Sequence, residues 1–203
     1  MIKTNKILTN SLALVFAVTL LLTNSSDINA SADKAILIKG KDFKIVFSDE
    51  ESGPLKIALK AFRKDFERVM GADPAVVNEM DGNKSQPEIV IVNRTSGFIS
   101  IPSGKIRKLD GFESHRIYAD AENNRIYIEG YDLRGTIFGI YTFSEEFLGV
   151  PPLHYWSSWV PDKKGEISVS ADCDIFFKSP QVRYRSILPG DQDFFNPWKK
   201  KIN

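Results

Sequence analysis

The sequence predicts an α+β domain, in which a mixed sheet carries two main helices on one face. The first observation behind this prediction is the order of the segments. Strand-like stretches come before, between and after two helix-like stretches, so both helices can cover the same face of one sheet. The second is that residues 87–93 form a continuous apolar run, which is typical of a central strand buried on both faces.

Residues 54–70 form the clearest helix-like stretch, because apolar residues recur at spacings of four and three while charged residues occupy the other side. Ser52 is placed to cap the start of this helix, Pro54 fits its first turn, and Gly71 is placed to end it. The apolar stripe consists of Leu55, Leu59, Phe62, Phe66 and Val69.

The remaining strand-like stretches are short and are bounded by turn residues. We expect residues 35–38 and 43–47 to form a first strand pair. Residues 115–119 and 125–129 alternate between apolar and polar side chains around a polar turn, which predicts a hairpin. Residues 166–169 are predicted to form a short edge strand.

A second helix-like stretch contains two glycines four residues apart, Gly135 and Gly139. Each glycine inside a helix costs about 1 kcal/mol relative to alanine. Their place on one face therefore predicts that the helix backbone approaches another element closely. The helix is expected to end at Gly149, ahead of Pro151 and Pro152.

Tyr155, Trp156 and Trp159 form a dense aromatic cluster in a segment that otherwise has the composition of a loop. Large aromatic side chains mostly serve as packing residues. One interpretation is therefore a hydrophobic wedge that holds two domains together. The other interpretation is a wall that contacts a sugar.

Residues 1–32 have the pattern of a signal peptide. Lys3 and Lys6 precede a short apolar run over residues 11–22, which is too short to span a bilayer. The small residues of Ala30-Ser31-Ala32 predict cleavage after Ala32 or, as the second choice, after Ala30. We expect an exported chain, periplasmic or secreted, with no membrane span after cleavage; a retained anchor helix is the alternative.

Charge and composition exclude several classes of function. The formal net charge of +1 argues against a nucleic-acid partner and against electrostatic docking on anionic membranes. The single cysteine, Cys173, has no partner for an internal disulfide, so the fold depends on its core. Neither His115 nor His154 belongs to a metal-ligand spacing, and we expect no metal and no cofactor.

The chain changes character near residue 172. We expect a first domain over residues 33–172, followed by a linker and a new strand over residues 182–188. Asp191 and Asp193 follow that strand, as acids do at the active-site end of a barrel strand. Aspartates also favour ordinary turns through local backbone hydrogen bonds, so this alternative stays open.

These residues support a family resemblance. The run from Arg134 to Tyr141, then Ser144-Glu145, Gly149-Val150 and Tyr155-Trp156, resembles the N-terminal domain of glycoside hydrolase family 115. That family comprises exported α-glucuronidases that remove glucuronic acid from xylan side chains. The resemblance implies that residues 33–172 are the α+β domain that precedes a (β/α)8 barrel. It also implies that residues 173–203 are a linker and the start of that barrel, which is incomplete in this sequence.

The resemblance also implies which residues serve the site. It makes Asp191 a catalytic residue of a partial site, and Asp193, Tyr155, Trp156 and Trp159 substrate-binding residues for a glucuronoxylan-like polysaccharide. The family's Asn-Asp-Glu-Asp-like loop is Gly190-Asp191-Gln192-Asp193 here. Because one acidic loop cannot supply both carboxyl groups, the 203-residue chain is expected to be inactive. The tail over residues 172–203 is expected to be mobile, or to be a source of self-association through exposed aromatic residues, Phe176, Phe177, Phe194, Phe195 and Trp198. The alternatives are a standalone carbohydrate-binding or accessory domain, and a structural domain of a polysaccharide-use system.

Overall fold

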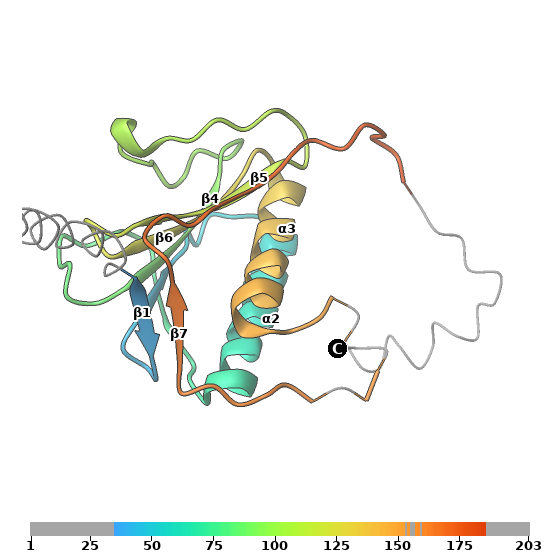
Figure 1. Ribbon diagram of the computed structural model, residues 1–203. Coiled ribbons are helices and arrows are strands. Elements are labelled where there is room, and N and C mark those ends of the chain that lie inside the picture. Colours follow the sequence, from blue (N-terminus) through green and yellow to red (C-terminus); the bar gives the residue numbers. More distant parts are fainter. Residues whose placement is uncertain (1–34, 153, 155–156, 159, 186–203) are drawn as a thin grey trace, which may run out of the picture. The chain divides into compact units, whose positions relative to one another are not determined.

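A computed structural model describes residues 35–152, 154, 157–158 and 160–185 (Figure 1). Its main sheet has six strands in the order β3-β2-β4-β6-β5-β8, and β1 and β7 form a separate two-stranded sheet. The strands are β1 (Ile36–Lys39), β2 (Lys44–Val46), β3 (Ala75–Val77), β4 (Glu88–Asn93), β5 (His115–Asp120), β6 (Arg125–Gly130), β7 (Glu166–Val169) and β8 (Asp174–Phe177).

The main sheet is mixed, as the sequence predicts. Strands β3, β2, β4 and β6 run parallel, whereas β5 is antiparallel to both β6 and β8. Every residue of β4 is buried, so the apolar run at residues 87–93 is indeed a central strand. Strands β5 and β6 form the expected hairpin, in which His115 is paired with Gly130 and Asp120 with Arg125.

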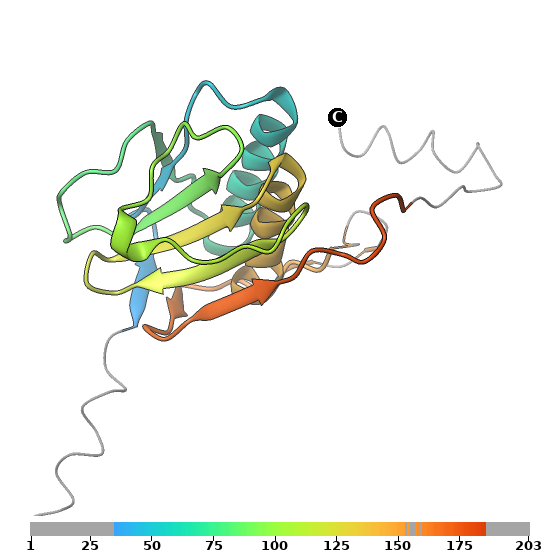
Figure 2. The ribbon, with the colours of Figure 1, turned by 90° about the horizontal axis from the view of Figure 1, so that it is seen from above.

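Two helices cover one face of this sheet, which confirms the predicted fold class (Figure 2). Helix α2 spans Gly53–Met70, and helix α3 spans Leu133–Phe143 and continues as a π-helix, η2, over Ser144–Leu148. Helix α2 ends at Gly71, whose φ of 68° is the left-handed conformation that favours glycine. Ser52 occupies the N-cap position, but its side chain makes no capping hydrogen bond.

The core between helices and sheet is rich in aromatic side chains. Phe62 of α2 contacts Phe143 of α3 edge to face, with ring centroids 5.4 Å apart, and Phe66 contacts Phe43 with centroids 4.7 Å apart. All four side chains are fully buried. The apolar stripe of residues 54–70 thus packs the helix pair and the sheet together.

A smaller cluster covers the opposite face of the sheet. Val90 and Tyr127 belong to it, and Ile99 and Ile101, which lie in the long connection between β4 and β5, pack against it. A 3-10 helix, η1 (Ser103–Lys105), lies in the same connection. The sheet is therefore covered by helices on one face and by this connection on the other.

Strand pairing differs from the prediction at the start of the chain. Residues 35–38 and 43–47 do not pair with each other: β1 is antiparallel to β7, and β2 lies between β3 and β4. Residues 166–169 form a strand, as expected, but in the small sheet with β1. Both differences have one cause, because pairing partners are chosen by tertiary packing that short stretches do not encode.

The first domain also extends beyond residue 172, where a linker was expected. Residues 174–177 form β8, in which Phe177 is paired with His115. The Arg116 guanidinium lies over the Phe176 ring, 4.4 Å from the ring centroid. The expected tail residues Phe176 and Phe177 are thus part of the sheet. Residues 182–185 form no strand; the rest of the predicted strand, the barrel start and the signal peptide at 1–32 lie outside the described residues.

Within the part of the chain that the structure describes, no helix is both long enough and apolar enough to cross a membrane.

Candidate functional site

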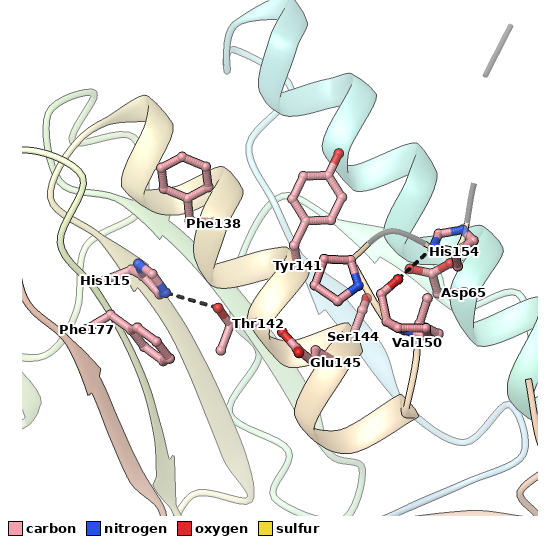
Figure 3. Close-up of a pocket in the computed structure, with 12 residues that line it drawn as sticks. Asp65, His115, Phe138, Tyr141, Thr142, Ser144, Glu145, Val150, His154 and Phe177 are labelled. Carbon is pink, nitrogen blue, oxygen red and sulfur yellow. Dashed lines mark hydrogen bonds between the residues drawn. The ribbon is translucent and has the colours of Figure 1, made fainter. Parts of the chain in front are cut away.

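A pocket of about 500 Å³ lies beside the junction of α3 and η2 (Figure 3). Its walls come from α2, α3, η2, the paired ends of β5 and β8, and the segment that follows η2. The lining residues are Asp65, His115, Phe138, Tyr141, Thr142, Ser144, Glu145, Val150, Pro151, Pro152, His154 and Phe177.

The sequence around Gly149 shapes one side of this pocket. Gly149 has a φ of 73° and ends the π-helix, and the Val150 amide donates to the Ser144 carbonyl at 2.9 Å. The two prolines that follow prevent the helix from continuing, so the chain turns back over the pocket. π-helical turns are rare and often occur at functional sites, which draws attention to this junction.

The two glycines of α3 let the helix approach β5 and β6 closely. A Cβ atom on Gly135 would lie 2.5 Å from the Ser114 carbonyl oxygen, and one on Gly139 would lie 2.9 Å from Ile128 Cγ2. The close approach predicted from these glycines is therefore confirmed. It also brings Thr142, at the end of α3, within reach of the His115 imidazole.

His115 is held firmly in the pocket wall. Its Nε2 lies 3.0 Å from the Thr142 hydroxyl, its Nδ1 lies 3.3 Å from the Glu113 carbonyl oxygen, and its ring stacks on Phe177 with centroids 4.7 Å apart. Because a carbonyl only accepts, Nδ1 carries the hydrogen and Nε2 accepts from Thr142. Burial lowers the pKa of His115, which favours the neutral ring.

Asp65 is a buried acidic residue in the wall of the pocket. It is 2% exposed, and burial raises the pKa of this carboxyl group, although Ser144, His154 and Arg68 act in the opposite direction. Arg68 Nη1 lies 3.4 Å from Asp65 Oδ1 and 3.1 Å from His154 Nε2. The contact between Arg68 and His154 therefore ties α2 to the segment after η2, within which His154 Nδ1 lies 3.1 Å from the Pro151 carbonyl oxygen.

These contacts define what the pocket can do chemically. The Asp65 carboxylate and the His115 imidazole are buried and already engaged by neighbouring groups, whereas Glu145 is exposed. Apolar surface from Phe138, Tyr141 and the prolines forms much of the wall. Such a combination suits the binding of a ligand with an apolar face better than acid–base chemistry on it.

Among the described residues, no group of three or more His, Cys, Asp or Glu side chains lies close enough together to bind a metal ion.

The site residues predicted from the sequence, Tyr155, Trp156, Trp159, Asp191 and Asp193, all lie outside the described residues. The structure instead brings together pocket residues that the sequence prediction missed. One signal for them was available, because Phe138, Tyr141, Thr142 and Glu145 recur at helical spacings of three and four. No local signal joins them to Asp65, His115 or Phe177, which come from α2 and from two different strands.

Comparison with solved structures finds a similar fold in a glycoside hydrolase. No family model and no curated protein matches the sequence. Among solved structures, a family 115 4-O-methyl-α-glucuronidase with specificity for decorated arabinogalactans is similar, with a TM-score of 0.58 and 20% identity. The match covers 73% of this chain and 19% of that enzyme.

Two further solved structures in the comparison are β-hexosaminidases. An N-acetyl-β-hexosaminidase from Streptomyces plicatus has a TM-score of 0.47 and 13% identity, and the match covers 74% of this chain and 24% of the enzyme. A family 20 β-N-acetylhexosaminidase from Streptomyces coelicolor A3(2) has a TM-score of 0.46, with the same identity and coverage.

The likeness to the α-glucuronidase shows the fold: the described residues adopt a family 115-like α+β fold, as the sequence resemblance implies. The chain spans about a fifth of that enzyme's length.

Proposed function

We propose that this chain supplies the α+β domain of an exported glycoside hydrolase that resembles family 115 α-glucuronidases. The enzyme would remove glucuronic acid side chains from a glucuronoxylan-like polysaccharide. The observation that carries this proposal is the likeness to the α-glucuronidase over 73% of the chain. The pocket is not proposed as the catalytic centre, because its buried carboxylate and histidine are engaged by Arg68 and Thr142 rather than poised for proton transfer. Asp191 remains the predicted catalytic residue, and it would act as part of a complete (β/α)8 barrel.

The 203-residue chain is expected to release no glucuronic acid from glucuronoxylan or from a decorated arabinogalactan. Inverting hydrolysis needs two carboxyl groups roughly 6.5–9.5 Å apart on opposite faces of the sugar, and the predicted acidic loop supplies only one of them. A colorimetric or chromatographic assay of released uronic acid measures this, with an active α-glucuronidase as the positive control. Release that disappears in Asp65→Asn or Glu145→Gln would contradict the proposal and make the pocket the active site.

A standalone carbohydrate-binding role is the second candidate, and the pocket is the observation that favours it. Phe138 and Tyr141 offer ring surface to a sugar, and Thr142 and Glu145 offer hydrogen-bonding groups beside it. Titration of the labelled chain with xylo-oligosaccharides, followed by NMR, separates the two candidates. Saturable chemical-shift changes centred on Tyr141, Thr142 and Glu145 would favour the standalone binding domain. If the oligosaccharides cause no shift changes, the domain of a larger glycoside hydrolase is favoured.

Export is the further part of the proposal, and it rests on the Lys3 and Lys6 start, the short apolar run and Ala30-Ser31-Ala32. Expression in the native host is expected to yield a protein in the periplasm or medium whose first residue is Asp33 or Ser31. N-terminal sequencing of that fraction checks the cleavage site. Recovery of the chain from the cytosol with Met1 intact would contradict it.

A further inference from the structure

Glu113 has a backbone conformation that few residues of its kind adopt. Its φ of 61° lies in the left-handed region, although the residue is not a glycine. The surroundings fix this conformation from both sides: the Glu113 amide donates to Asp132 Oδ2 at 3.1 Å, and its carbonyl accepts from His115 Nδ1 at 3.3 Å. Strained conformations of this kind persist only where neighbouring groups over-determine them, and they cluster at functional positions.

The Glu113 carboxylate lies between two arginines. Arg134 Nη1, from the first turn of α3, lies 3.0 Å from Oε1, and Arg185 Nη2 donates to Oε2. The carboxylate side chain is 4% exposed, whereas the two arginine side chains are 58% and 42% exposed. A nearly buried carboxylate thus has one partner fixed on a helix and one partner on a segment that leaves the domain.

That segment, residues 179–185, follows β8, and we call it the exit segment (Figure 2). Two further contacts hold it to the loop that contains Glu113. The Ser179 amide donates to Asp110 Oδ1 at 2.8 Å, and the Arg183 guanidinium lies 5.6 Å from the centroid of the Phe112 ring. The Arg185 guanidinium also donates to the Val182 carbonyl at 2.5 Å, which holds this side chain against the backbone of the exit segment.

We propose that Glu113 is a latch that fixes the exit segment, as far as Arg185, on the α+β domain. The Ser179 contact holds the start of the segment, and the Glu113–Arg185 pair holds its end. Removing Arg185 leaves the carboxylate paired with Arg134, so the buried charge keeps a partner and the domain stays folded. The inference is independent of the proposed function, because it concerns only how the exit segment is held.

The test is backbone NMR relaxation of the 15N-labelled 203-residue chain and of Arg185→Gln. In the parent, the heteronuclear NOE values of residues 182–185 are expected to match those of β8, because the latch suppresses motion on the picosecond to nanosecond timescale. In Arg185→Gln they are expected to fall well below those of β8, while the amide shifts of β5 and α3 stay in place. Arg63→Gln is the matched control, since it breaks an exposed arginine pair with Asp73 elsewhere.

A second variant, Glu113→Gln, keeps the side-chain shape but removes the charge that both arginines share. It is expected to free the same residues. Low NOE values at residues 182–185 in the parent would overturn the latch, and so would unchanged values in Arg185→Gln. A loss of ordered structure in β5 and α3 in Arg185→Gln would also overturn it, because the pair would then hold the domain together rather than the exit segment.

Discussion

Gly130→Ala is expected to leave little or no folded protein. A Cβ atom at this position would lie 2.0 Å from the Thr136 backbone nitrogen and 2.3 Å from its hydroxyl oxygen. The first turn of α3 has little freedom to move away. The Asp132 carboxylate accepts from the Gly135 amide at 2.8 Å, and the Thr136 amide donates to the Asp132 carbonyl at 2.9 Å. Overpacking costs about 1–3 kcal/mol where side chains can adjust, so a clash with backbone should cost more than about 3 kcal/mol.

Urea denaturation followed by circular dichroism measures the effect of this substitution. Since small domains are stable by only about 5–15 kcal/mol, the variant should unfold at a much lower urea concentration, if it folds at all. Gly53→Ala is the matched control: Gly53 begins α2, and an added Cβ there meets nothing within 4 Å. It should be neutral or slightly stabilising. An unchanged midpoint in Gly130→Ala would show that α3 can shift away from β6.

Arg94→Met should destabilise the domain by about 3–5 kcal/mol at neutral pH, the usual cost of leaving a buried charge without its partner. The Glu129 side chain, on β6, is 0% exposed, and the Arg94 guanidinium pairs with its carboxylate. Burial raises the pKa of Glu129, and the Arg94 charge acts in the opposite direction. Loss of Arg94 therefore removes the main group that offsets the cost of burying this carboxylate.

The loss of stability in Arg94→Met is expected to depend on pH. The pKa of Glu129 is raised in the folded state, so the folded protein holds the carboxyl proton more tightly than the unfolded chain does. The contribution of Glu129 to stability is therefore greatest below the ordinary pKa of the carboxyl group, and it is lost as pH rises through the raised pKa of the folded state. Arg94→Met raises that pKa further. The stability gap between variant and parent should therefore widen as pH rises and narrow as pH falls.

Urea denaturation at about pH 5 and about pH 8 tests the sign. The double variant Arg94→Met, Glu129→Met should recover most of the lost stability and lose the pH-dependent part. Arg63→Met serves as the control, because the exposed Arg63–Asp73 pair should contribute only about 0–1 kcal/mol. Equal losses in Arg94→Met at both pH values would show that Glu129 is not the group responsible.

The parts of the fold that could be predicted are those whose signal is local and strong. The apolar stripe of residues 54–70, the buried run that became β4, and the alternation of the β5–β6 hairpin each fix one element without reference to the rest. The glycine pair of α3 also gave a correct statement about packing, because a glycine in a helix needs a reason outside the helix.

The parts that could not be predicted depend on distant partners. Strand β3 is three residues long and partly exposed, and β8 is a four-residue edge strand, so neither carries a clear periodic signal. The π-helix at Ser144–Leu148 continues the α-helical sequence pattern, and no local sequence signal distinguishes it; the Gly149 and Val150 amides both donate to the Ser144 carbonyl. Strand order in a parallel sheet likewise depends on packing rather than on local sequence.

The candidate pocket shows the same limit more clearly. Asp65, His115 and Phe177 come from three elements that are far apart in the sequence, and only the folded sheet and helices bring them together. The aromatic and acidic residues that the sequence singled out, Trp156 and Asp191 among them, lie outside the described residues.

The pairing of β1 with β7, and of β5 with β8, bears on how the chain acquires its structure. Among the strands that the structure describes, β1 pairs with β7, near the end of the domain, and an edge of the main sheet stays open until β8 pairs with β5. Pairings between residues so distant in sequence are slow to form, since the entropy of closing long loops must be overcome before any contact is gained. During synthesis, β5 would thus exist for some time with an unpaired outer edge, since only its other edge is paired, with β6. That interval is when the chain is most exposed to aggregation.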